Sequence, residues 1–128
     1  MEKRKVLIVE DEQDICQFMK RMLELKGCEV FTALTAQEGW EIFQREKPQA
    51  CSIDILLSHS EFDGTELLRR IRQIDKNVLC VMVTRIDDKK TMNEVEELGI
   101  DGIFIKPPAA GELDNLIDQL AHGKRKEA

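Results

Sequence analysis

Short apolar segments and amphipathic helical segments alternate five times along the 128 residues of this chain. The apolar segments, of strand length, cover residues 5–9, 28–33, 50–53, 78–83 and 103–105. Strands that alternate with helices form parallel sheets, and the right-handed crossovers place helices on both faces. The sequence therefore predicts an α/β fold: a doubly wound parallel sheet of five strands with five helices.

The helical segments carry start and stop signals. The run Thr35-Ala36-Gln37-Glu38 has the form of a capping box and opens a helix that Pro48 closes. Gly27 stops the first helix, and the third begins after Asp63-Gly64. At this length the chain fits a single domain, which we assign to residues 1–128.

The composition excludes several classes of function. The formal net charge is -6 at pH 7, whereas nucleic-acid or anionic-membrane contacts need clustered Lys and Arg. No apolar run approaches the roughly 20 residues of a membrane-spanning helix. We therefore expect a cytoplasmic protein with no direct nucleic-acid binding and no membrane contact. The four cysteines lack the spacing of a zinc or redox motif and are expected to be reduced core residues: Cys16, Cys28, Cys51 and Cys80.

Polar side chains follow four of the predicted strands at the point where each strand ends. Asp54 follows residues 50–53, and Glu10-Asp11 follows residues 5–9. Thr84 ends the fourth strand, and Lys106 ends the fifth. In open parallel sheets the ligand site lies outside the carboxyl ends of the strands. We therefore expect three carboxylates, a hydroxyl and an ammonium to meet at one edge of the sheet.

This set of side chains suits a divalent cation and a phosphoryl group. Carboxylate oxygens are ligands that Mg²⁺ prefers, together with water and phosphate oxygens. A carboxylate beside such a cation can attack phosphorus and form an aspartyl phosphate. Lys106 would pair with the phosphoryl oxygens as a point charge, and Thr84 could donate a hydrogen bond to them.

The chain resembles a response-regulator receiver domain of two-component signalling over essentially its whole length. The resemblance is carried by residues 5–12, the Asp54 strand, Asp63-Gly64, Val83-Thr84 and Ile105-Lys106-Pro107. It implies a flavodoxin-like receiver fold with strand order 2-1-3-4-5. It also implies a phosphorylation-dependent switch that accepts a phosphoryl group on Asp54 from a histidine kinase or a histidine phosphotransfer protein.

The resemblance further implies roles for individual residues. Asp11 would ligate Mg²⁺ directly and Glu10 through water, with Asp54 and the backbone carbonyl of Leu56 completing the metal site. Thr84 and Lys106 would grip the phosphoryl group, and the Lys106-Pro107 bond would be cis. Such a protein is a phosphoacceptor with at most self-dephosphorylation activity, and not an enzyme in any other sense.

Several positions depart from the family pattern. The loop between Asp54 and Gly64 is longer than usual over Ser58–Glu61, and Ser58 stands where a proline is common. His59 in this loop is expected to be exposed. Arg85 replaces a small residue, and we expect it to overhang the phosphoryl group and lengthen the phosphorylated lifetime. Ile103 replaces an aromatic residue, so the usual aromatic switch is not expected, and the neighbouring Phe104 should face the other side of the sheet.

Three other functions compete with that of a stand-alone receiver, a switch without an output domain of its own. A haloacid-dehalogenase-type phosphohydrolase needs a second acid two residues after the nucleophile, and Leu56 occupies that place. A flavodoxin-like nucleotide binder needs a phosphate cradle after the first strand, where this chain has carboxylates. The remaining alternative is a pseudo-receiver, an interaction module that is never phosphorylated. The resemblance also implies that protein targets, and a possible homodimer, would be found at the face formed by the fourth helix, fifth strand and fifth helix.

Overall fold

The computed structural model describes residues 2–85 and 88–125. Its sheet has five parallel strands in the order β2-β1-β3-β4-β5, as the resemblance implied. The α/β doubly wound fold predicted from the sequence is confirmed. The strands are β1 (Lys5–Val9), β2 (Glu29–Ala33), β3 (Ala50–Ile53), β4 (Leu79–Thr84) and β5 (Gly102–Ile105).

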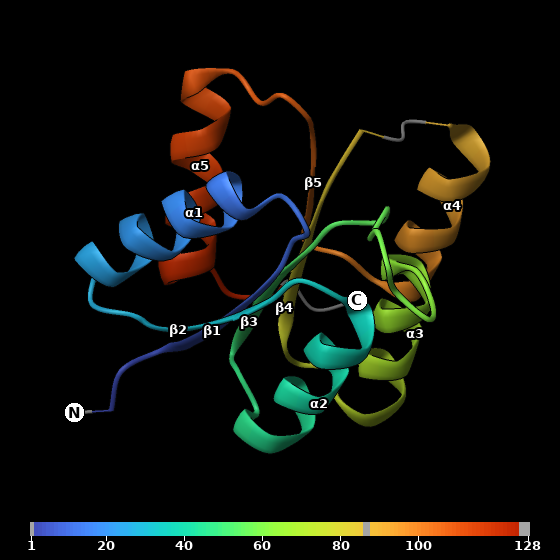
Figure 1. The fold of residues 1–128 in the computed structure, drawn as a ribbon, viewed down its shortest axis with the longest axis horizontal. Coiled ribbons are helices and arrows are strands. Elements are labelled where there is room, and N and C mark those ends of the chain that lie inside the picture. Colours follow the sequence, from blue (N-terminus) through green and yellow to red (C-terminus); the bar gives the residue numbers. More distant parts are fainter. Residues whose placement is uncertain (1, 86–87, 126–128) are drawn as a thin grey trace.

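Helices cover both faces of the sheet (Figure 1). One face carries α1 (Gln13–Leu25) and α5 (Ala110–His122), and the other carries α2 (Ala36–Glu46), α3 (Gly64–Ile74) and α4 (Lys89–Leu98). Because side chains alternate along each strand, the core forms two apolar layers. The layer under α1 and α5 includes Val6, Ile8, Val81, Leu116 and Leu120, and the layer under α2–α4 includes Leu7, Val9, Ile53, Leu67 and Met82.

The predicted helix signals are present with one difference in detail. The Thr35 hydroxyl caps α2 by accepting a hydrogen bond from the Glu38 N–H at 3.2 Å. The Glu38 carboxylate accepts instead from the N–H of Leu34, one residue before the cap. The reciprocal half of the capping box is therefore displaced by one residue. The side chain of Asp63 caps α3 in the same way, at 2.9 Å from the Glu66 nitrogen.

The cysteines behave as the sequence predicts. All four are free thiols in the buried core. Cys51 and Cys80 are register partners on β3 and β4, and neither is exposed to solvent. Within residues 2–85 and 88–125, no helix combines the length and apolar character needed to cross a membrane.

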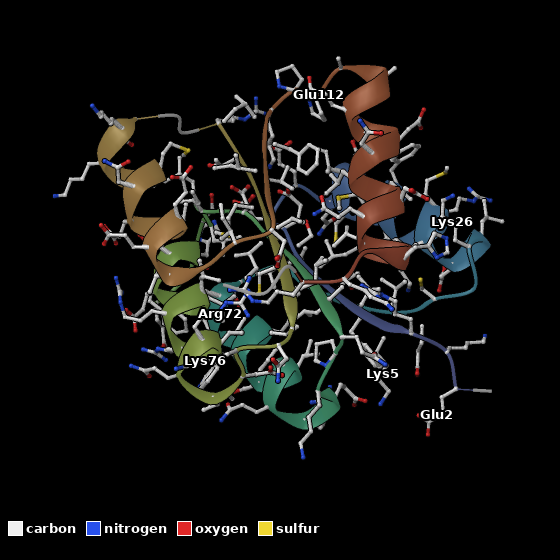
Figure 2. The ribbon with its side chains drawn as sticks, turned by 180° about the vertical axis from the view of Figure 1, so that it is seen from behind. Glu2, Lys5, Lys26, Arg72, Lys76 and Glu112 are labelled. Carbon is white, nitrogen blue, oxygen red and sulfur yellow. The ribbon has the colours of Figure 1, made fainter. Side chains whose placement is uncertain are left out.

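A buried ionic network lies at the edge of the sheet at which the strands begin. Figure 2 shows Arg72 on α3, far from Glu112 in the first turn of α5 at the other edge. The Arg72 guanidinium donates to the carbonyl oxygens of Gly99 and Val78 at 2.9 and 2.7 Å. It also lies 3.7 Å from the Asp101 carboxylate, which Arg125 contacts at 3.1 Å. The network joins α3, β4, the start of β5 and the C-terminal segment.

Candidate functional site

Backbone hydrogen bonds extend the sheet ladder beyond the strands and fix the site residues at its carboxyl edge. The Asp54 N–H donates to the Val9 carbonyl at 3.0 Å, and the Glu10 N–H donates to the Ala33 carbonyl at 2.9 Å. The Lys106 N–H donates to the Thr84 carbonyl at 2.9 Å. These residues therefore lie together at one edge of the sheet, as predicted, because the strands are parallel and end at the same level.

Three carboxylates gather at this edge. Glu10, Asp11 and Asp54 each present an oxygen atom, and these oxygens lie within 4.8 Å of one another. Glu10 and Asp54 are buried, whereas Asp11 is half-buried. The N–H of Leu56 donates to Asp54 Oδ1 at 3.2 Å and orients the carboxylate. Because the cluster offers only oxygen atoms as ligands, it fits a hard cation such as Mg²⁺.

The Lys106 ammonium is the counter-charge inside this cluster. Its Nζ lies 2.7 Å from both Glu10 Oε1 and Asp54 Oδ2, and 3.5 Å from Glu12 Oε1. Burial lowers the pKa of Lys106, but its hydrogen bonds to Asp54 and Glu10 outweigh that effect and raise the pKa overall. Lys106 is therefore a positively charged group at neutral pH, in contact with the predicted phosphoacceptor.

The carboxylates respond differently to this environment. Burial raises the pKa of Glu10 to about 7 even though Lys106 acts in the opposite direction. Burial likewise raises the pKa of Asp54, again against the effect of Lys106. For Asp11, burial is outweighed by hydrogen bonds, chiefly from Ser58, and the pKa is lowered. Glu10 and Asp54 thus share the ammonium of Lys106, and burial favours the protonated form of both.

Other predicted site residues lie around the cluster. Thr84 is fully buried at the end of β4. The Lys106-Pro107 bond is cis, which confirms the geometry implied by the resemblance. The roles of Thr84 in phosphoryl binding and of the Leu56 carbonyl in metal binding stay predictions.

The loop after Asp54 adds contacts that the sequence did not reveal. The Ser58 N–H donates to Asp11 Oδ2 at 2.8 Å. The Gly64 N–H donates to the Ile55 carbonyl at 2.8 Å, and a Cβ on Gly64 would overlap the Asp54 carbonyl oxygen. The signal available in the sequence was the departure from proline at Ser58, because serine has the N–H that proline lacks. His59 is exposed, as expected, and has a left-handed backbone with φ of 59°.

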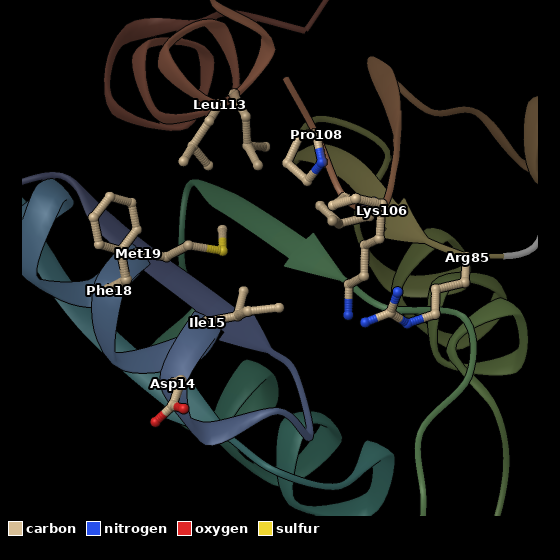
Figure 3. Close-up of a pocket in the computed structure, with 11 residues that line it drawn as sticks. Asp14, Ile15, Phe18, Met19, Arg85, Lys106, Pro108 and Leu113 are labelled. Atoms are coloured by element: carbon tan, nitrogen blue, oxygen red, sulfur yellow. The ribbon is translucent and has the colours of Figure 1, made fainter. Parts of the chain in front are cut away.

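Arg85 stands at the mouth of the site. Its Nη2 donates to Glu12 Oε1 at 3.0 Å, and 57% of its side chain is exposed. Figure 3 shows Arg85 and Lys106 on one side of a pocket, with apolar side chains of α1 and α5 on the other. The pocket has a volume of about 310 Å³ and is lined by Ile15, Phe18, Met19, Pro108 and Leu113, among others.

Ile103 and Phe104 face opposite sides of β5, as predicted. Ile103 is half-buried and packs against the layer under α2–α4, whereas Phe104 packs against the layer under α1 and α5. Ile103 therefore fills space beneath α4 without an aromatic ring. Its influence on output stays a prediction.

The family model of the response regulator receiver domain matches residues 6–118. This chain belongs to that family. Among curated proteins, the receiver is 32% identical over 126 residues to the probable transcriptional regulator ycf27 of Guillardia theta, covering 98% of this chain and 48% of that protein. It is 28% identical over 107 residues to sporulation initiation phosphotransferase F of Bacillus subtilis, covering 84% and 85% of the two chains.

A solved structure gives the same answer for the fold. The CheY-like receiver domain protein from Methanospirillum hungatei JF-1 superposes with a TM-score of 0.84 at 29% identity, covering 92% of this chain and 93% of that one. The receiver spans about half the length of the ycf27 regulators that it matches. What those longer proteins do is therefore a property of their whole chains.

Proposed function

We propose that this receiver is a phosphorylation-dependent switch that accepts a phosphoryl group on Asp54 from a histidine kinase or a histidine phosphotransfer protein. One observation carries the proposal. The buried Asp54 carboxylate lies 2.7 Å from the Lys106 ammonium and shares a 4.8 Å cluster of oxygen atoms with Glu10 and Asp11. A nucleophile, a counter-charge for phosphoryl oxygens and a cation site are thus combined at one edge of the sheet.

The transfer is a displacement at phosphorus. An Asp54 carboxylate oxygen attacks the phosphorus of a phosphohistidine, an O–P bond forms, and the N–P bond breaks. The electron pair of the broken bond stays with the imidazole, which takes up a proton as it leaves. Glu10, Asp11, Asp54 and the Leu56 carbonyl would hold Mg²⁺, whose positive charge would offset the negative charge of the phosphoryl oxygens.

Lys106 is placed to follow the charge from the carboxylate to the phosphoryl group. Its ammonium contacts Glu10 and Asp54 at the same distance of 2.7 Å. When Asp54 is phosphorylated, its contact with Lys106 is replaced by one to a phosphoryl oxygen, while Glu10 keeps the ammonium in place. The Thr84 hydroxyl donates a second hydrogen bond to the same group in this proposal.

Arg85 sets the lifetime of the phosphorylated form in this proposal. Glu12 contacts both Arg85 and Lys106, at 3.0 and 3.5 Å, so the guanidinium is held beside the ammonium at the open side of the site. A long side chain fixed in this position restricts the approach of water to the phosphorus. Self-dephosphorylation, the only catalytic activity that we assign, would therefore be slow.

Output would proceed through protein contacts rather than an aromatic switch, because Ile103 supplies no ring. The face of α4, β5 and α5 carries Ile105, which is 39% exposed at the end of β5. We assign target binding, or a homodimer, to this face, and sedimentation of the phosphorylated protein tests the homodimer. The stand-alone action, the cytoplasmic location and the absence of direct nucleic-acid binding predicted from the sequence stay predictions.

Phosphorylation by acetyl phosphate with Mg²⁺, read by intact mass, tests the proposed function. We expect one added phosphoryl mass in the native chain and none in Asp54→Asn. A native chain that gains no mass from acetyl phosphate is then offered a phosphorylated histidine phosphotransfer protein. Failure with both donors, together with absence of Mg²⁺ binding by calorimetry, would establish the pseudo-receiver instead.

A further inference from the structure

Asp11 is held by a hydrogen bond that a proline at position 58 could not make. The donor is the backbone N–H of Ser58, which lies 2.8 Å from Asp11 Oδ2 and 47 residues away in the sequence. Proline has no N–H, so the contact exists only because Ser58 departs from the family pattern. The loop therefore reaches back across the site to one of the proposed metal ligands.

This contact matters because Asp11 is the most exposed member of the carboxylate cluster. Glu10 and Asp54 are buried, and Lys106 holds both at 2.7 Å. Asp11 is half-buried, and like charge within 4.8 Å favours rotation of its carboxylate into solvent. The Ser58 N–H opposes that rotation, because a hydrogen bond to a charged acceptor is stronger than one between neutral groups.

The same loop is fixed to the first turn of α2. The Ala36 N–H donates to Ser60 Oγ at 2.9 Å, and the Glu61 N–H donates to Gln37 Oε1 at 3.0 Å. Three N–H groups thus connect Asp11, the loop of residues 58–61 and the start of α2. A displacement of the loop would move the donor that orients Asp11.

We propose that Ser58 is a positioning residue for the metal ligand Asp11, and that Mg²⁺ binding is thereby coupled to docking of residues 58–61 on α2. The inference rests on the Mg²⁺ site of the proposed function. Coupling of this kind is reciprocal: the docked loop strengthens Mg²⁺ binding, and bound Mg²⁺ stabilises the docked loop by the same factor. Binding of Mg²⁺ would then change how firmly the longer loop docks at the surface beside α2.

The first test compares Ser58→Pro with Ser58→Ala by calorimetric titration with Mg²⁺. Ser58→Pro removes the N–H, and we expect a loss of affinity of about three- to tenfold, the size expected for one hydrogen bond at an exposed loop. Ser58→Ala keeps the N–H and removes only the hydroxyl, which also hydrogen-bonds to Asp11, so its loss of affinity should be smaller than that of Ser58→Pro. Equal affinity of the native and Ser58→Pro chains, with both folded by circular dichroism, would overturn the inference. Absence of Mg²⁺ binding in the native chain would instead overturn the metal site of the proposed function.

The second test does not depend on the folding of the proline variant. Amide hydrogen exchange of the native chain, followed by NMR with and without Mg²⁺, should show slower exchange at Ser58, Glu61 and Ala36 in the presence of the ion. In Ser60→Ala, which removes the acceptor of the Ala36 N–H, protection by Mg²⁺ should persist at Ser58 and disappear at Ala36. Faster exchange at Ser58 on addition of Mg²⁺ would show that the metal takes Asp11 from the loop, and this would overturn the proposal.

Discussion

The Lys106 ammonium lies 2.7 Å from the Asp54 carboxylate, with 2% and 5% of the two side chains exposed. A buried ion pair of this kind is costly to form, because both charges lose their hydration. Here the charges are also unequal in number, since Glu10 shares the same ammonium and Asp11 lies within the same cluster. The pocket therefore favours uptake of a proton or a cation, and the stability of the cation-free protein should depend on pH.

Glu10→Gln should raise the stability of the cation-free protein above pH 7. Burial raises the pKa of Glu10 from its ordinary 4.5 to about 7, so the folded state keeps a proton that the unfolded state loses. The stabilisation associated with that proton is complete below pH 4.5 and is lost as the pH rises through about 7. Because a glutamine side chain does not ionise, the variant escapes this loss. We expect its free energy of unfolding to exceed that of the native chain by about 1–3 kcal/mol at pH 8 and by little at pH 4.5. Urea unfolding in EDTA at the two pH values measures this difference in stability, and an equal difference at both would contradict the explanation.

Arg85→Ala should shorten the lifetime of the phosphorylated protein. The substitution removes the guanidinium that Glu12 holds at 3.0 Å, which opens the phosphoryl group to water. We expect dephosphorylation to accelerate roughly two- to tenfold, the latter corresponding to about 1.4 kcal/mol in the barrier. The decay of the phosphorylated mass after removal of acetyl phosphate gives the rate.

Arg45→Ala is the matched control for Arg85→Ala, because Arg45 is also exposed and paired with a glutamate, on α2. Its decay should equal that of the native chain. If Arg85→Ala decays at the native rate as well, Arg85 does not protect the phosphoryl group.

The sequence predicted those features that depend on periodicity and on strand ends. The alternation of strands and helices determines the layers, and parallel strands must bring Glu10, Asp54 and Lys106 to one edge. The strand order came from the family resemblance, since the apolar pattern of a strand does not encode its neighbours. The Ser58–Asp11 hydrogen bond was not predictable, because it depends on the course of an irregular loop. The Arg72–Asp101 pair was missed because its two side chains come from separate elements, and no pattern in the sequence marks them as neighbours.

Gly64→Ala should destabilise the protein and perturb the site together. An added Cβ would overlap the carbonyl oxygen of Asp54, and the first turn of α3 would have to move away from the site. Overpacking of this kind costs about 1–3 kcal/mol. Gly111→Ala is the control, because nothing lies within 4 Å of a Cβ built there in the first turn of α5. Urea unfolding should separate the two variants, and equal stability would show that the backbone near Asp54 yields without cost.

Arg72→Met should reduce stability while leaving phosphorylation intact. The guanidinium is buried at the edge of the sheet opposite the site, and its removal deprives three carbonyl oxygens of their Arg72 donor, those of Asp75, Val78 and Gly99. Asp101 keeps its contact with Arg125. Breaking a buried pair costs about 3–5 kcal/mol, reduced here because Arg125 still contacts Asp101. Arg69→Met on the same helix removes two surface ion pairs, with Glu66 and Glu94, and should cost about 1 kcal/mol or less. Urea unfolding compares the two, and acetyl phosphate labelling at a temperature where both are folded should give native phosphoryl incorporation. Equal destabilisation by the two substitutions would show that the network contributes no more than a surface pair.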